Sequence, residues 1–220
     1  FIIIWIIIFL IMSFYLFGSY FGKFKFNYKS FSGWFFLLFS LYLVSGLFES
    51  KNVRLLSGIL PPEFYSINEN NNDCPLGLNC FKDYESGKKY AIDNDKIILL
   101  DFTGWACANC RRMEENVWSK PAIFNLLDSE FVIISLYVDD RSKLSEEEEF
   151  KYLNSSGNIQ YINNVGRRWS LFQQINFSNA SQPYYVAMMP SGKILTEPIQ
   201  YASEKNFENW LRLSLEESIK

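Results

Sequence analysis

The chain has 220 residues, of which 49% are hydrophobic and 18% aromatic, and its formal net charge is −3. It contains no histidine, which excludes Ser-His-Asp and Cys-His nucleophiles, zinc-protease helices and haem attached through C-x-x-C-H. All 24 acidic residues follow residue 48, and an acidic surface disfavours nucleic acid as a partner.

Two long uncharged runs, residues 1–22 and 30–48, fill the first part of the chain. Each approaches the roughly 20 residues needed to cross a bilayer. The first run lacks the positive region and the small-residue cleavage pattern of a signal peptide. We therefore predict two transmembrane helices within residues 1–48, with a buried core helix as the alternative for the second run. Because the chain begins with Phe rather than Met, we expect these helices to end a longer membrane domain.

The loop between the two runs is positively charged, with Lys23, Lys25 and Lys29 and no acid. Such loops tend to remain cytoplasmic, so we expect everything after residue 48 to lie on the outer side. Lys51 and Arg54, just beyond the second run, weigh against this orientation. The prediction is a protein of the inner, cytoplasmic membrane whose C-terminal part is on the periplasmic or outer face.

Residues 49–72 are predicted to be a linker, because they contain a Pro-Pro pair and several asparagines without apolar periodicity. Beyond them, continuous apolar runs predict two strands that are buried on both faces, at residues 96–102 and 131–140. Residues 141–164 are charged and polar, and we expect a surface excursion in which four glutamates open a solvated helix.

The remaining predicted elements are helices and one hairpin. Helices are expected at residues 84–94, 107–118, 121–130, 165–174 and 204–219. A Pro-Ser-Gly turn predicts a two-stranded hairpin within residues 182–198. This order of elements is that of an α/β thioredoxin-like fold at residues 73–220, a mixed four-stranded sheet flanked by helices on both faces.

The stretch DFTGWACANCRRMEENVW, residues 101–118, places Cys107 and Cys110 two residues apart between a strand and a helix. As a structural bridge, this pair would close too short a loop to stabilise much. As half of a zinc site, it would need ligands from Cys74, Cys80 or carboxylates, and the C-x5-C spacing of the other pair lies outside the usual knuckle. We favour a redox pair and expect no metal and no cofactor.

A redox role assigns different tasks to the two sulfurs. Cys107 opens the helix, where unpaired backbone N–H groups favour its thiolate, and we predict that a lowered pKa makes it the attacking sulfur. Cys110, about one turn further, would attack the mixed disulfide that Cys107 forms. Trp105 offers a flat apolar surface on which a partner chain could rest.

Asp101 and Pro183 are further candidates for the site. Asp101 is either a strand-end carboxylate that accepts backbone hydrogen bonds, or a buried acid with a raised pKa that takes the proton of Cys110. Pro183 begins a strand, a place where proline is ordinary. In a thioredoxin-like fold, a cis proline here faces the cysteine pair and leaves the preceding backbone free to pair with a substrate strand, and we expect the cis form.

The segment DFTGWACANCRRMEENVWSKP, preceded by CPLGLNCFKDYESGKKYA and two hydrophobic runs, resembles the C-terminal part of the DsbD family of transmembrane thiol:disulfide interchange proteins. The resemblance implies that electrons arrive through the membrane from cytoplasmic thioredoxin and pass to protein disulfides outside, supporting disulfide isomerisation and cytochrome c maturation. Cys107 and Cys110 match the catalytic pair of the family, and Asp101 and Pro183 match the buried acid and cis proline of thioredoxin folds. The membrane-embedded cysteine pair of the family has no counterpart in residues 1–48, so an upstream membrane redox domain becomes an expected partner.

Cys74 and Cys80 can form a second disulfide that pins the linker to the domain on an oxidising outer face. A second redox pair is the alternative. The predicted activity is that of a protein-disulfide reductase acting on extracytoplasmic partner proteins. A disulfide oxidase or isomerase would use the same sulfurs at another potential, and a non-catalytic thioredoxin-like binding module or a zinc-held domain would not need their chemistry.

Overall fold

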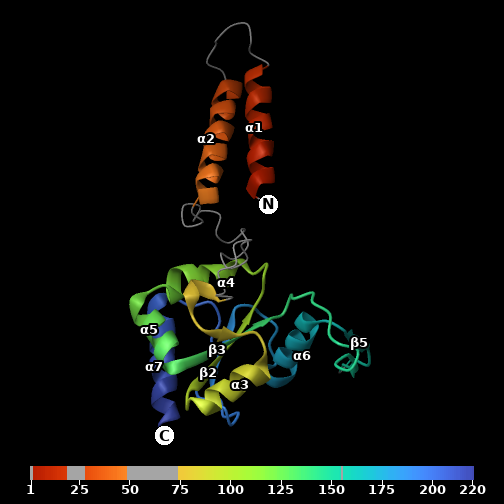
Figure 1. The fold of residues 1–220 in the computed structure, drawn as a ribbon, viewed down its shortest axis with the longest axis vertical. Coiled ribbons are helices and arrows are strands. Elements are labelled where there is room, and N and C mark those ends of the chain that lie inside the picture. Colours follow the sequence, from red (N-terminus) through yellow and green to blue (C-terminus); the bar gives the residue numbers. More distant parts are fainter. Residues whose placement is uncertain (1, 19–27, 49–73, 155) are drawn as a thin grey trace. The chain divides into compact units, whose positions relative to one another are not determined.

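A computed structural model describes residues 2–18, 28–48, 74–154 and 156–220 of the chain. The chain forms two compact units, Phe1–Ser57 and Gly58–Lys220 (Figure 1). The predicted linker and most of the charged residues that suggested a membrane orientation lie outside the described residues. The linker, the domain limits beside it and the orientation therefore stay predictions.

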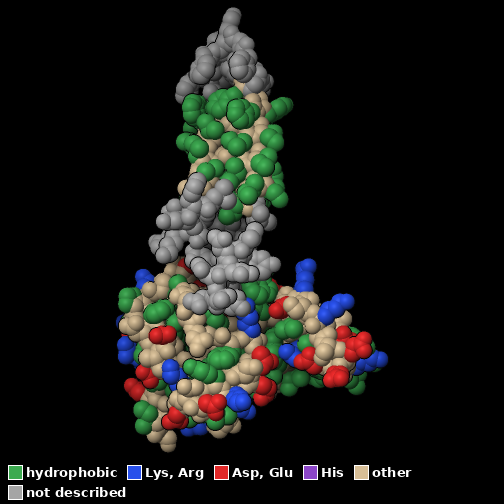
Figure 2. Space-filling view, in the orientation of Figure 1, with side chains coloured by type: hydrophobic (Ala, Val, Ile, Leu, Met, Phe, Trp, Pro, Cys, Tyr) green, Lys and Arg blue, Asp and Glu red, His purple; other side chains and the backbone are tan. Residues whose placement is uncertain are grey.

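The first unit is a pair of helices, α1 (Ile2–Gly18) and α2 (Tyr28–Phe48). Ser13 Oγ on α1 donates a hydrogen bond of 3.0 Å to the carbonyl oxygen of Gly33 on α2. The ring of Phe9 packs edge-on against Phe39, with 4.9 Å between the ring centroids. Apolar side chains also cover much of the outer surface of the pair (Figure 2).

The prediction of two transmembrane helices does not agree with this unit. In the described parts of the chain, no helix is both long enough and apolar enough to span a membrane. α1 has 17 residues and is therefore about 26 Å long, which is shorter than the hydrocarbon core of about 30 Å. α2 has 21 residues, but a lysine and several serine and glycine residues dilute its apolar character.

The second unit is built on a mixed four-stranded sheet, as predicted. The strand order is β1-β3-β2-β6, in which β1, β3 and β2 are parallel and β6 is antiparallel to β2. The strands are β1 (Cys80–Phe81), β2 (Ile97–Thr103), β3 (Phe131–Tyr137) and β6 (Tyr184–Met188). Every residue of β2 and β3 is buried, which confirms the expectation from their continuous apolar runs.

The membership of the sheet differs from the prediction at its edges. The second strand of the predicted hairpin does not form, and residues 193–199 meet β6 only at two isolated bridges, Met188 with Ile194 and Tyr185 with Ile199. Between these bridges the outer segment contains two more residues than β6, so it bulges and cannot keep a regular ladder. The fourth strand is instead the two-residue β1, beside β3.

Five helices cover the two faces of the sheet, and π-helical η3 (Glu114–Trp118) continues one of them. The helices are α3 (Tyr84–Asp93), α4 (Ala108–Met113), α5 (Pro121–Glu130), α6 (Val165–Phe177) and α7 (Glu204–Ser218). Residues of α4, η3, α5 and α7 form one apolar cluster with Leu99 and Ile133. Residues of α3 and α6 form the other with Leu100, Phe102 and Ile134. Side chains alternate along β2, so Asp101 points to the α4 face.

Residues 141–164 contain a hairpin rather than a helix. Its strands, β4 (Phe150–Leu153) and β5 (Ile159–Ile162), are antiparallel. The first three of the four glutamates before β4 lie in a turn, in which Glu148 accepts a hydrogen bond of 2.8 Å from Ser145 Oγ and pairs with Arg168 at 2.9 Å. The predicted solvated helix is therefore wrong, although the segment does lie on the surface.

Candidate active site

The cysteine pair lies where β2 gives way to α4. Cys107 is the N-cap residue of α4, and its sulfur accepts a hydrogen bond of 3.2 Å from the backbone N–H of Cys110. The two cysteines form a disulfide, so the structure represents the oxidised form. Cys107 is partly exposed, whereas Cys110 is only 1% exposed. An incoming thiol or disulfide can therefore reach the first sulfur but not the second.

Asp101 is a buried acid on the face of β2 that α4 covers. Its side chain is 2% exposed, and Oδ2 accepts a hydrogen bond of 3.0 Å from Ser135 Oγ on the adjacent strand. Oδ1 is buried without a hydrogen-bond partner among the described residues. Burial raises the pKa of Asp101 to about 7, against the opposing effects of the Ser135 hydrogen bond and the charge of Arg111. A proton on this carboxyl is therefore readily exchanged near neutral pH.

Arg111 and Glu114 form a buried ion pair next to the cysteines, and sequence reasoning missed both. Arg111 is 3% exposed, and its Nη1 lies 2.5 Å from Glu114 Oε2 while Nη2 donates a hydrogen bond of 3.2 Å to Thr103 Oγ1. Burial raises the pKa of Glu114, and the guanidinium of Arg111 opposes that rise. Since Arg111 stays protonated and acts on two carboxyl groups whose pKa values are both raised, Glu114 and Asp101 together supply its counter-charge and hold an exchangeable proton.

The loop before Cys107 is held by Asp139, another residue that the sequence did not indicate. The Asp139 carboxylate accepts hydrogen bonds from the backbone N–H groups of Trp105, at 2.8 Å, and Ala106, at 2.9 Å. Gly104 allows this approach, because a Cβ atom there would lie 3.0 Å from the carboxylate. The loop is therefore anchored to the end of β3 directly before the attacking sulfur.

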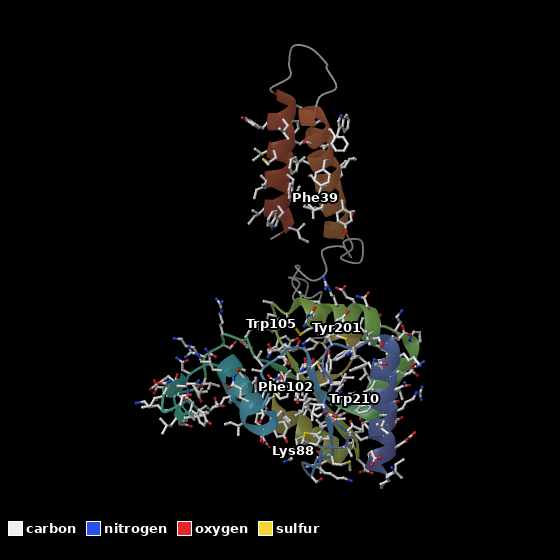
Figure 3. All side chains as sticks on the ribbon, turned by 180° about the vertical axis from the view of Figure 1, so that it is seen from behind. Phe39, Lys88, Phe102, Trp105, Tyr201 and Trp210 are labelled. Atoms are coloured by element: carbon white, nitrogen blue, oxygen red, sulfur yellow. A yellow bond between two sulfur atoms is a disulfide. The ribbon has the colours of Figure 1, made fainter. Side chains whose placement is uncertain are left out.

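Trp105 has neighbours that limit its predicted role as a platform. Its ring stacks on Tyr137, with 4.1 Å between centroids, and Lys82 Nζ lies 5.4 Å from the ring centroid. The residue is partly exposed and lies beside the start of α4 (Figure 3). Tyr137 thus covers one face of the ring, and a partner chain could contact only the remaining exposed surface of Trp105.

Pro183 lies at the same end of the sheet as the cysteine pair. The Gln182–Pro183 peptide bond is cis, as expected. Pro183 directly precedes β6, whose first residue, Tyr184, pairs with Phe102 near the end of β2. Because the chain runs from Phe102 through Thr103 into the cysteine loop, Pro183 and Cys107 both lie at the end of the sheet where β2 finishes and β6 begins.

Cys74 and Cys80 form a second disulfide. Cys80 pairs with Ile133, which pairs with Leu99, four residues before the end of β2 and so about 13 Å back along the strand. Between the two cysteines, Leu78 is buried in the apolar cluster under α4. The part of the chain that the structure describes contains no cluster of three or more potential metal ligands.

Comparison with known proteins gives the class of this domain. Residues 79–159, which include β1 to β3 and the cysteine pair, match a family described as thioredoxin-like. Together with the mixed sheet and its flanking helices, this match supports a thioredoxin-like fold for the second unit. None of the curated proteins compared matches the chain.

Solved structures with a similar arrangement have low sequence identity to this chain. A thioredoxin from Thermus thermophilus is 18% identical, with a TM-score of 0.43 over 61% of this chain and 85% of that one. A DsbH oxidoreductase is 14% identical, with a TM-score of 0.46 over 63% and 85% of the two chains. A disulphide isomerase from Xylella fastidiosa Temecula1 is 13% identical, with a TM-score of 0.39 over 58% and 85%.

Proposed function

We propose that the second unit is a protein-disulfide reductase that acts through Cys107 and Cys110. The observation that carries this proposal is the unequal burial of the pair: Cys107 is partly exposed at the start of α4, while Cys110 is buried on the same helix. A thiol pair in this arrangement can attack with one sulfur and resolve with the other. The buried acid of β2 supplies a proton acceptor on the same face of the sheet.

The reaction begins with the reduced pair. The Cys107 thiolate attacks one sulfur of a partner's disulfide, forms a mixed disulfide and releases the other sulfur of the partner as a thiolate, which takes up a proton. The Cys110 thiol then loses its proton and attacks Cys107 Sγ. The second partner thiolate leaves, and the domain is left with the Cys107–Cys110 disulfide that the structure contains. Two electrons have passed to the partner.

Asp101 would accept the proton of Cys110 in the second step. Its pKa of about 7 means that protonated and ionised forms are both populated near neutral pH, so the carboxylate can take up a proton and later return it. The charge of Arg111, which pairs with Glu114, opposes the rise in the pKa of this carboxyl.

The electron donor and the compartment belong to the same proposal. Regeneration of the reduced pair requires a dithiol donor. The DsbD resemblance suggests that an upstream redox domain is this donor and that the electrons support cytochrome c maturation. The Cys74–Cys80 disulfide favours a location outside the reducing cytoplasm, because structural disulfides persist mainly in oxidising compartments.

The direction of transfer is tested by the reduction potential of the Cys107–Cys110 pair, measured by equilibration with glutathione buffers. A reductase should have a potential more negative than about −200 mV. A value near the strongly oxidising end, about −120 mV, would contradict the proposal. Turnover of a protein disulfide with dithiothreitol as donor, compared with Cys107→Ser, tests whether exchange occurs at all.

A further inference from the structure

The side chain of Gln173 on α6 is fully buried, yet both ends of its amide group are hydrogen-bonded to the loop that precedes β6. Nε2 donates a hydrogen bond of 2.9 Å to the carbonyl oxygen of Ser181. Oε1 accepts one of 3.2 Å from Gln182 Nε2. Its exposed fraction is 0%, so these bonds are made away from competing water.

The loop that Gln173 contacts, residues 178–182, has no helix or strand but is organised by side chains along its length. Ser178 ends α6 in the left-handed region, with φ 49°. Asn179 Oδ1 accepts hydrogen bonds of 2.7 Å from both the backbone N–H and the hydroxyl of Ser181. Gln182 Nε2 also donates to the carbonyl oxygen of Ala180 at 2.9 Å. The backbone that enters Pro183 is therefore fixed before any partner arrives.

The hydrogen bonds of Gln173 are not needed to cap the C-terminus of α6. There, the carbonyl oxygen of Gln174 already accepts a hydrogen bond of 3.1 Å from the backbone N–H of Ser178. Gln173 reaches past that end, to the two residues that directly precede Pro183. Gln173 therefore holds residues 181 and 182, which lead into Pro183 at the end of the sheet where the cysteine pair lies.

We infer that Gln173 is a positioning residue for partner binding: it orders the main chain of residues 181–183, against which an extended segment of a disulfide-bearing protein lies while its sulfur meets Cys107. This inference rests on the proposed exchange function. A loop that is ordered beforehand avoids the entropy loss that a mobile loop would suffer on binding, so Gln173 contributes to affinity and leaves the sulfur chemistry unchanged.

The test is Gln173→Met, which preserves side-chain length and removes both hydrogen bonds. For a protein disulfide such as insulin we expect KM to rise about tenfold, the loss that corresponds to one or two hydrogen bonds. The value of kcat, the rate with a small disulfide such as hydroxyethyl disulfide, and the reduction potential should stay as in the wild type. Gln174→Met is the matched control, because Gln174 is exposed and, among the described residues, its side chain bonds Ser170 on the same helix, at 3.4 Å, and not the loop before Pro183.

A second variant keeps the test decisive if Gln173→Met fails to fold. Gln182→Met removes the reciprocal donor from the partly exposed loop and should raise KM in the same way, without adding to the effect of Gln173→Met where both can be combined. The inference is overturned if folded variants keep the wild-type KM, or if their rates with the small and the protein disulfide fall in parallel. A wild type that reduces neither substrate would instead refute the proposed function.

Discussion

The guanidinium of Arg111 and the carboxylate of Glu114 form an ion pair inside the protein, with 2.5 Å between Arg111 Nη1 and Glu114 Oε2 and only 3% and 9% of the two side chains exposed. Arg111 directly follows Cys110, and its charge acts on Asp101 as well as on Glu114. The second cysteine is thus adjacent in sequence to a buried cluster of one cation and two carboxyl groups. The free energy of unfolding and the rate of the resolving step should therefore both depend on the charges of these three groups.

Removing the cation should destabilise the domain strongly. Arg111→Met leaves two buried carboxyl groups without a counter-charge, so we expect the free energy of unfolding at pH 7 to fall by about 3 kcal/mol or more. The loss should be smaller at pH 5, where the carboxyl groups can be neutralised by protons. Urea unfolding measures both values. Arg112→Met, an exposed neighbour, should change stability by less than about 0.5 kcal/mol, and an equal loss in both variants would contradict the role of Arg111.

The stability of the oxidised domain should depend on pH through Asp101. Its pKa is raised from 3.8 to about 7, so the folded chain binds this proton more tightly than the unfolded chain does. The free energy of unfolding should therefore fall as the pH rises between about 4 and 7, by at most about 1.4 kcal/mol per pH unit from this carboxyl.

Asp101→Asn should reduce the slope of that part of the pH profile, leaving the slope that Glu114 contributes through its own raised pKa. The exposed Asp128→Asn on α5 serves as the control and should leave the slope unchanged. Denaturant midpoints measured across the pH range give the comparison. An unaltered slope in Asp101→Asn would mean that the carboxyl does not hold its proton as described.

The same substitution should slow the resolving step. Without a proton acceptor near Cys110, the mixed disulfide should decay about 100-fold more slowly at pH 7, the lower range of general-base effects. Raising the pH should restore the rate, because Cys110 then ionises without help. Single-turnover experiments with a labelled disulfide separate this step from the first attack, and a slowed first attack with normal decay would exclude the assigned role.

The Cys74–Cys80 disulfide should stabilise the fold without taking part in turnover. Replacing both cysteines by serine should lower the free energy of unfolding by about 2 kcal/mol, the entropy effect expected for so short a loop. Reduction of a protein disulfide should continue at the wild-type rate, because Cys80 is in register with Leu99, four residues before the end of β2 from which the chain enters the cysteine loop. A loss of activity larger than the fraction unfolded would point to a redox role for the second pair.

Most of the sheet and the central pair could be predicted because their signals are local. Continuous apolar runs identified β2 and β3, and a single acid in the first of these runs identified Asp101. The Cys107–Cys110 spacing at a strand-to-helix junction was visible directly in the sequence. Each of these signals depends on a few neighbouring residues.

Other features depend on partners that are distant in the chain. Arg111 and Glu114 belong to a charged segment that looks like a solvated helix, and only burial of that helix face reveals their pairing. Asp139 follows β3 and meets the cysteine loop through tertiary structure alone. β1 is two residues long and too short for any periodicity, so its pairing with β3 could not be predicted.

The central claim is that Cys107 attacks and Cys110 resolves. The most direct measurement is trapping of mixed disulfides with an oxidised protein such as insulin, analysed by mass spectrometry for reduced Cys110→Ser and Cys107→Ser side by side. We predict that Cys110→Ser accumulates a covalent adduct through Cys107 and that Cys107→Ser does not, because Cys110 is only 1% exposed. An adduct on Cys107→Ser alone, or none on either variant, would contradict the account.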